Sequence, residues 1–227
     1  MNEESKTIEE VAKASGKAID AARELGRFLL KYVGGSLEQA MGIVEDKLKY
    51  LRWERQKRLQ ERANQFLAER GLSQPSRNVP LQVIIPLIQG GSLEEDDSLQ
   101  DRWAALLVNA ADASSDTEVR RAFISILEDL TPLDALLLEK IYSSTVVPDV
   151  EAEIWTTFLP DHVTEKKPEQ ENLRPPNHVE VSLANLARLG LIITAMAWGS
   201  FAIFSCVYRT VLGREFMKAI TSAKTDT

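Results

Sequence analysis

The fold is decided by residues 93–142, LEEDDSLQDRWAALLVNAADASSDTEVRRAFISILEDLTPLDALLLEKIY, in which apolar residues recur at intervals of three and four. That spacing lines side chains along one face of a helix. Acidic, Ser or Thr residues precede each apolar run, where their side chains can bond the free amide groups of a first helical turn. We therefore predict three consecutive helices that bury one shared core. The predicted core residues are Trp103, Leu106, Leu107, Phe123, Ile126, Leu127, Leu136 and Leu137.

Each of the three helices has its own start signal in the sequence. Ser92 opens the first, and the acidic residues 94–97 occupy its first turn, where the helix dipole favours negative charge. Residue 115 or 116 is expected to cap the second helix. Residues 131–134, Thr-Pro-Leu-Asp, place a capping residue, a proline and an acid where the third helix needs them.

Two further helices are predicted before this block. Residues 6–32 repeat apolar side chains with a helical period, which indicates an amphipathic helix. The glycines at 34–35 end it, and Ser36 with Gln39 forms the capping pattern of a next helix that runs to about Leu67.

The helix after Ser36 carries a candidate interaction surface with an apolar and a basic part. Its apolar residues step by four and three, as in a coiled-coil seam, and we expect residues 6–32 or a second subunit to cover them. Its basic residues have two interpretations. They bind phosphate, or they form a solvent-exposed helix face in which each pairs with an acidic residue four positions away. We favour the second interpretation. The surface consists of Leu37, Met41, Val44, Leu48, Leu51, Arg52, Arg55, Arg58 and Arg62.

Residues 71–80, GLSQPSRNVP, resemble a linker between this region and the central block. A short apolar helix over residues 81–89 follows. Pro86 predicts a kink or an early break in it, and Gly90 with Gly91 is expected to stop it.

A run of 20 residues without charge, LGLIITAMAWGSFAIFSCVY, occupies positions 189–208. It is long enough to cross a bilayer as a helix. However, Trp198 lies in its middle, and Gly199-Ser200 fits the turn of a hairpin between two segments rich in strand-forming residues. We favour the hairpin and keep the membrane helix as the alternative.

Helices are predicted on both sides of this hairpin, over residues 179–190 and from residue 210 onward. The order helix, hairpin, helix is that of a winged-helix-like unit. Before it we expect a short helix over residues 151–159 and a mobile polar loop over residues 161–177.

Specific DNA binding is not expected of this unit. A helix that reads bases needs polar and basic side chains, and the candidate helix offers Asn185 and Arg188 but also carries Glu180. A packing or protein-binding role is the stronger interpretation.

The charge and the cysteine content limit the possible functions. The net charge is −7: residues 1–75 hold 14 basic and 12 acidic side chains, whereas residues 76–227 hold 13 and 22. The acidic part is a poor general partner for nucleic acid or anionic lipid. The single cysteine, Cys206, suggests a reducing compartment, and the charged start does not resemble a secretory signal, so a cytoplasmic location is expected.

Neither an enzymatic activity nor a cofactor or metal is expected. The sequence contains no glycine-rich phosphate loop, activated Cys/His pair or carboxylate dyad with persuasive spacing. His162 and His178 lack metal-ligand spacing and are expected to be exposed and inert. The four acids at 94–97 would point in different directions on a helix and could not converge on one ion.

Six segments of the chain follow one another in a recognisable order and spacing. The most specific are RWAALLVNAAD with the acidic run before it, and FISILEDLTPLDALLL. The others are GIVEDKLKYLRWERQKRLQER (42–62), VPLQVIIPLIQG (79–90), NLARLGLI (185–192) and TVLGREFMKAI (210–220). In these segments the chain resembles the Abi-alpha family of bacterial proteins associated with abortive infection against phage. The resemblance implies a phage-defence protein that acts by protein binding or oligomerisation, and it brings no catalytic residues.

These observations predict a mainly α-helical protein with three parts. They are a long-helix region (1–71), a central helical bundle (72–143) and a winged-helix-like unit with one β-hairpin (144–227). Two alternative functions remain open. One is a membrane-associated effector that inserts residues 189–208 or the N-terminal helix, and the other is a nucleic-acid-binding regulator that uses the basic helix at 47–62.

Overall fold

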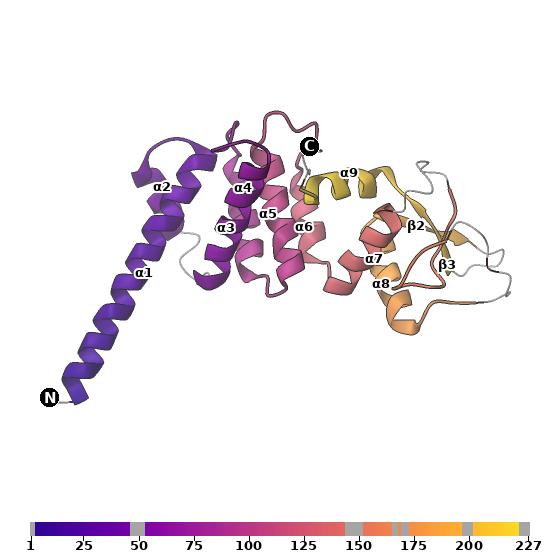
Figure 1. Cartoon of the computed structure of the whole chain (residues 1–227), viewed down its shortest axis with the longest axis horizontal. Coiled ribbons are helices and arrows are strands. Elements are labelled where there is room, and N and C mark those ends of the chain that lie inside the picture. The colour runs from indigo at the N-terminus through magenta and orange to yellow at the C-terminus, as the bar shows by residue number, and fades with distance from the viewer. Residues whose placement is uncertain are drawn as a thin grey trace. The chain divides into compact units, whose positions relative to one another are not determined.

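The computed structural model is mainly helical, with a small antiparallel sheet near the C-terminus (Figure 1). The structure describes residues 3–45, 53–143, 152–164, 168, 173–196 and 202–222. The chain forms two compact units. The first comprises Met1–Asp116 with Ser222–Thr227, and the second comprises Thr117–Thr221.

The first unit begins with the predicted amphipathic helix, α1, which spans Glu3–Val33. Gly34 and Gly35 end it with φ angles of 69° and 91°, which residues with a side chain rarely adopt. The predicted capping box is confirmed: Ser36 accepts from the amide of Gln39, and the Gln39 side chain accepts from the amide of Ser36.

The stretch predicted as one helix from residue 36 to 67 contains two described helices, α2 (Leu37–Ile43) and α3 (Trp53–Glu69). Residues 46–52 lie outside the described residues. Helix α2 lies against α1, whereas α3 lies against α4 (Leu81–Leu93) and α5 (Asp97–Ala111). The two halves of the predicted helix therefore pack on different elements.

The core of the first unit lies between α3, α4 and α5. Its fully buried side chains include Leu59 of α3, Ile84 and Leu87 of α4, and Trp103 and Leu107 of α5. Burial of one Leu or Phe side chain stabilises a fold by roughly 1.5–3 kcal/mol, so such a cluster holds the three helices together.

The prediction that Gly90 and Gly91 stop the fourth helix was wrong, because α4 continues through Pro86 and both glycines to Leu93. A Cβ at Gly90 would lie 2.5 Å from Cη2 of Trp103, and one at Gly91 would lie 2.9 Å from a methyl group of Leu59. The glycines are needed because α3 and α5 approach the backbone of α4 closely.

Helix α5 starts later than predicted. Its N-cap is Asp96, which accepts from the amide of Leu99, whereas Ser92 is buried inside α4. The linker-like segment 71–80 forms no helix or strand, but its arginine has a defined place. Arg77 donates to the carbonyls of Ala110 and Asn109 at 2.7 and 2.8 Å, which are among the free carbonyls at the end of α5.

The second unit contains α6 (Arg121–Glu128), α7 (Pro132–Ser143), α8 (Asn177–Arg188) and α9 (Val211–Ile220). The cap predicted for α6 at residue 115 or 116 was wrong: the N-cap is Arg120, and its side chain makes no capping bond. The box before α7 is confirmed, since Asp134 and Thr131 bond each other's amide groups.

Core burial in the second unit follows the prediction with one exception. Phe123, Leu127 and Leu137 are buried, and the rings of Phe123 and Phe216 meet edge to face at 5.7 Å. Leu136 is 40% exposed and does not belong to the core. Consecutive leucines of α7 point in different directions, and this one faces outward.

The uncharged run forms two strands in its described part, β2 (Ile192–Met196) and β3 (Ala202–Arg209), which pair antiparallel. This corrects the alternative of one membrane helix over 189–208. The predicted turn at Gly199-Ser200 lies outside the described residues. No helix among the residues that the structure describes is long and apolar enough to cross a membrane.

A third strand, β1 (Ile154–Trp155), pairs with β3 and gives the order β1-β3-β2. The short helix predicted over 151–159 was therefore wrong. Ile154 and Trp155 are strand formers that lie opposite Val207 and Cys206, and this pairing overrides a weak helical pattern. Most of the loop predicted over 161–177 lies outside the described residues.

Tyr142 joins three parts of the second unit. Its hydroxyl group donates to the carbonyl of Leu191 at 2.6 Å and accepts from the amide of Thr210 at 3.0 Å. Thr210 is the N-cap of α9 and accepts from the amide of Gly213. The end of α7, the start of β2 and the start of α9 therefore meet at one phenol group.

Candidate interaction surface and arginine ladder

The structure separates the predicted apolar surface into covered and exposed residues. Val44 is buried, and Met41 lies against α1, where a Cβ at Gly26 would be 2.6 Å from its sulfur atom. Leu37 is 44% exposed. Leu48, Leu51 and Arg52 lie outside the described residues. Helix α1 therefore covers the first part of the surface, which is one of the two arrangements expected.

The basic part of the surface forms a ladder of ion pairs with α5. Arg55 donates to Asp97 at 2.6 Å, Arg58 lies 3.1 Å from Asp101, and Arg62 donates two hydrogen bonds to Asp101 at 2.7 and 2.8 Å. The expected pairing with acids on the same helix holds for Lys57 and Glu61 at 3.8 Å. The three arginines instead use acids about 40 residues away along the chain.

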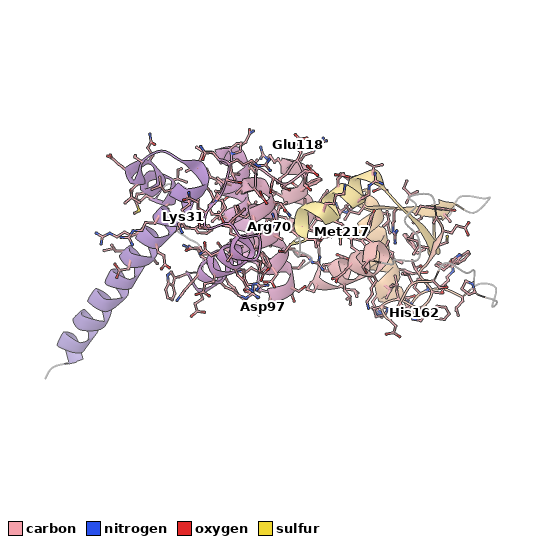
Figure 2. All side chains as sticks on the ribbon, turned by 45° about the horizontal axis from the view of Figure 1, so that its top comes forward. Lys31, Arg70, Asp97, Glu118, His162 and Met217 are labelled. Carbon is pink, nitrogen blue, oxygen red and sulfur yellow. The ribbon has the colours of Figure 1, made fainter. Side chains whose placement is uncertain are left out.

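The direction of the ladder shows that α3 and α5 run parallel. Arginines further along α3 meet residues further along α5, and the separation along the sequence stays between 39 and 43. We call the set Arg55, Arg58, Arg62 and Arg70, with their partners on α5, the arginine ladder. Arg70 and Asp97 mark its two ends (Figure 2).

Electrostatics of the exposed end follow from these contacts. The hydrogen bond from Arg55, with the charge of Arg58, lowers the pKa of Asp97. The hydrogen bond to Asp101 raises the pKa of Arg62. The side chains of Arg55, Arg58 and Arg62 are only 26–29% exposed, so most of each side chain is covered within the unit, where it pairs with Asp97 or Asp101.

The buried end of the ladder was missed by the sequence analysis. Arg70 donates to Asp112 at 3.0 Å and to Asn109 at 2.7 Å, and the two charged side chains are 9% and 5% exposed. Burial opposes ionisation of Asp112, but hydrogen bonds from Ser114 and Arg70 outweigh it, and the pKa of this carboxyl is lowered. The pair joins the residue after α3 to the C-cap of α5.

Gln100 is a second residue that the sequence did not reveal. It is fully buried, and its amide group donates to the carbonyls of Gly91 and Arg55 at 2.8 and 2.9 Å. Its oxygen accepts from Arg58 at 2.9 Å. One side chain thus satisfies backbone groups of α3 and α4 from its place on α5. The only available signal was a polar residue within an apolar stripe.

Helix α8, the candidate for reading bases, uses Asn185 and Arg188 to bond residues at the end of α6 and the start of α7. Asn185 donates to the carbonyl of Asp129 and to the carboxylate of Asp134, both at 3.0 Å. Arg188 donates to Asp129 at 2.8 Å. The most exposed apolar side chain of this helix is Val181, at 71%.

The remaining candidate groups do not converge. His162 and His178 are both exposed, as expected, and the ring of His162 stacks on Phe158 at 5.1 Å. Cys206 is buried, and burial raises the pKa of its thiol to about 11. Within the described ranges no group of three or more His, Cys, Asp or Glu residues could hold a metal ion.

Helix α1 carries both buried and exposed apolar side chains. Leu25, Leu29 and Tyr32 are at most 1% exposed, whereas Ile19 is 54% exposed. The N-terminal turns of α1 run past α2, with no other described element of the unit beside them (Figure 1). This helix was predicted as amphipathic, but the exposure of Ile19 was not predicted.

Comparison with known proteins gives one match. The family described as abortive infection alpha matches residues 54–220, which include the arginine ladder and the whole second unit up to α9. Searches of curated proteins and of solved structures found no match. The match covers most of the chain, in the same region as the segments that carried the resemblance. The chain therefore belongs to the abortive infection alpha family, which gives it a role in abortive infection, a defence against phage.

Proposed function

We propose that the protein acts in abortive infection by binding protein, without catalysing a reaction. The observation that carries the proposal is the apolar face of α1, which is buried at Leu25, Leu29 and Tyr32 but exposed at Ile19. Ile19 is 54% exposed, and Leu37, at the edge of the covered part, is 44% exposed. An apolar face that continues beyond its cover is typical of a protein-binding surface.

The arginine ladder counts against the nucleic-acid alternative. Phosphate binding needs basic side chains that are free to release their counterions. Arg55, Arg58 and Arg62 already pair with Asp97 and Asp101, which would compete with phosphate for them. A cytoplasmic location remains part of the proposal, and fractionation of the native host cell tests it.

The test compares Ile19→Glu with a matched control, Arg27→Gln, in cells challenged with phage. Both side chains are exposed on α1, but only the first belongs to the apolar face. Ile19→Glu should abolish capture of the bound protein from infected cells and should reduce protection. Arg27→Gln should preserve both.

Circular dichroism of the two variants checks that α1 remains folded. Undiminished protection by a folded Ile19→Glu variant would refute the proposal. Loss of protection by both variants would also refute it, because the effect would then not depend on the apolar face.

A further inference from the structure

Two carboxylates of α5 bridge the arginines at the exposed end of the arginine ladder. Asp97 accepts from Arg55 at 2.6 Å and lies 3.3 Å from Arg58. Asp101 lies 3.1 Å from Arg58 and accepts two hydrogen bonds from Arg62. Arginine makes the same paired hydrogen bonds to phosphate as to carboxylate. The two aspartates therefore take places that phosphate oxygens could occupy.

The two ends of the ladder differ in their access to water. The side chain of Asp97 is 67% exposed and that of Asp101 is 32% exposed, whereas Arg70 and Asp112 at the other end are buried. Exposed ion pairs contribute little to the stability of a fold. The exposed end can therefore exchange one anion for another while the core around Leu59 keeps α3 in place.

We propose that the exposed end is an autoinhibitory contact, in which Asp97 and Asp101 cover a binding site for the phosphate backbone of nucleic acid. The site consists of Arg55, Arg58 and Arg62. While the two carboxylates hold these arginines and repel phosphate, nucleic acid binds weakly. Removal of the two negative charges uncovers the site. The inference is separate from the apolar face of α1 and does not rest on the proposed function.

The spacing of the three arginines suits a row of phosphates. Arg55, Arg58 and Arg62 follow one another at intervals of three and four residues, which places them on one side of α3 over two turns. Basic side chains clustered along a helix are typical of proteins that bind nucleic acid. The hydrogen bond from Arg55, with the charge of Arg58, lowers the pKa of Asp97, so this carboxylate is charged at neutral pH and competes with phosphate.

A membrane fits this surface less well, because interfacial helices insert large apolar side chains. The large apolar side chains between residues 59 and 67 of α3 are buried in the first unit. An acidic protein also fits less well, because the centre of a protein interface is apolar. The residues next to Arg58 and Arg62 on the exposed side of α3 are Glu61, which pairs with Lys57, and Gln65.

Binding of a short fluorescein-labelled DNA duplex to the full chain tests the proposal. Asp97→Asn combined with Asp101→Asn should lower the Kd about ten-fold relative to the wild type, because two negative charges leave the surroundings of the bound phosphates. The slope of log K against log salt should become more negative by about 2–3, since three arginines are freed to contact phosphate.

A charge control separates the uncovering of the site from a general loss of negative charge. Glu24→Gln combined with Glu38→Gln removes the same charge from exposed residues of α1 and α2. This variant should keep the wild-type Kd, because neither carboxylate pairs with a described arginine of the ladder.

Removal of the arginines tests the site itself. Arg55→Gln, Arg58→Gln and Arg62→Gln, added to the double aspartate variant, should abolish the gain in affinity and return the salt slope to that of the wild type. Circular dichroism checks the fold of every variant. If the double variant does not fold, Asp97→Asn alone, at the more exposed position, should show part of the gain.

Three results would overturn the inference. They are a wild type that binds the duplex as tightly as the double aspartate variant, a gain that the charge control matches, or a gain that survives the loss of the three arginines. Tighter binding of the double aspartate variant to phosphatidylglycerol vesicles than to the duplex would also overturn it, and would assign the arginines to a membrane surface.

Discussion

At the residue scale, Gly213 shows how closely the parts of the second unit approach one another. A Cβ at this position would overlap the hydroxyl group of Tyr142 and the carbonyl oxygen of Leu191. Those two groups are bonded to each other, so neither can move without breaking the contact that joins α7 to β2.

We predict that Gly213→Ala destabilises the protein by about 2–4 kcal/mol, which is typical of steric overpacking with loss of a buried hydrogen bond. The control is Gly42→Ala, since nothing lies within 4 Å of a Cβ there and alanine favours a helix. Urea unfolding measures both. Equal stability of the two variants would show that the close approach at Gly213 does not exist.

The buried pair of Arg70 and Asp112 gives a second prediction, which concerns pH. The folded-state pKa of Asp112 is lowered, so the charged carboxylate stabilises the fold at neutral pH. This contribution is lost as the pH falls below the ordinary aspartate range, roughly pH 4, towards the lower folded value.

Asp112→Asn should therefore lower the melting temperature at pH 7. In acid, the difference in melting temperature between the variant and the wild type should become smaller. Removal of one member of a buried pair costs about 3–5 kcal/mol. Melting curves of both proteins from pH 7 to pH 3 provide the measurement, and a gap that stays constant across this range would contradict the assignment.

At the element scale, helix α3 is held on α5 both by apolar contact and by the arginine ladder. Leu59 is fully buried, whereas the side chain of Arg62 is 26% exposed. Partly exposed ion pairs contribute about 0.2–1 kcal/mol, but removal of a buried leucine side chain costs about 2–5 kcal/mol.

We therefore expect Leu59→Ala to destabilise the protein several-fold more, in free energy, than Arg62→Gln. Chemical unfolding at low and high salt separates the two effects, because salt weakens only the ion pair. A larger loss from Arg62→Gln would mean that the exposed end of the ladder, and not the core, fixes this helix.

Elements could be predicted from sequence where the signal was local. The Ser36–Gln39 and Thr131–Asp134 boxes, the end of α1 at Gly34 and the strand character of residues 192–196 each depend on neighbouring residues. The predictions failed where the deciding contact was distant. Gly90 looks like a helix stop until Trp103 is known to pack on it, and Ile154 joins a strand because Val207 lies opposite.

The arginine ladder likewise has features that could be predicted from local sequence and features that depend on distant contacts. The basic and acidic runs were both visible in the sequence, but nothing local indicated that Arg55 would meet Asp97 rather than a glutamate on its own helix. Gln100 and Arg70 were missed because their roles depend on the parallel packing of α3 and α5.

At the scale of the whole molecule, two compact units each contain a buried core. Leu107 belongs to the first and Leu127 to the second, and both are fully buried. Leu107→Ala and Leu127→Ala should each cost about 2–5 kcal/mol. Leu136→Ala is the matched control in the second unit and should cost under about 1 kcal/mol, because that leucine is already 40% exposed.

Thermal unfolding monitored by calorimetry would measure all three variants. Unchanged stability of the first two would contradict the helical cores. A loss in Leu136→Ala as large as in Leu127→Ala would contradict the outward position of Leu136.

The contacts of Tyr142 also determine which part of the structure can form first during translation. Its hydroxyl group bonds residues that lie 49 and 68 positions further along the chain. At roughly 5–20 residues per second, a ribosome needs several seconds after Tyr142 to produce Thr210. The arginine ladder, by contrast, is complete in sequence once Asp112 has been made. Helices α3 and α5 can therefore join while translation continues, but the junction at Tyr142 must wait until Thr210 has been made.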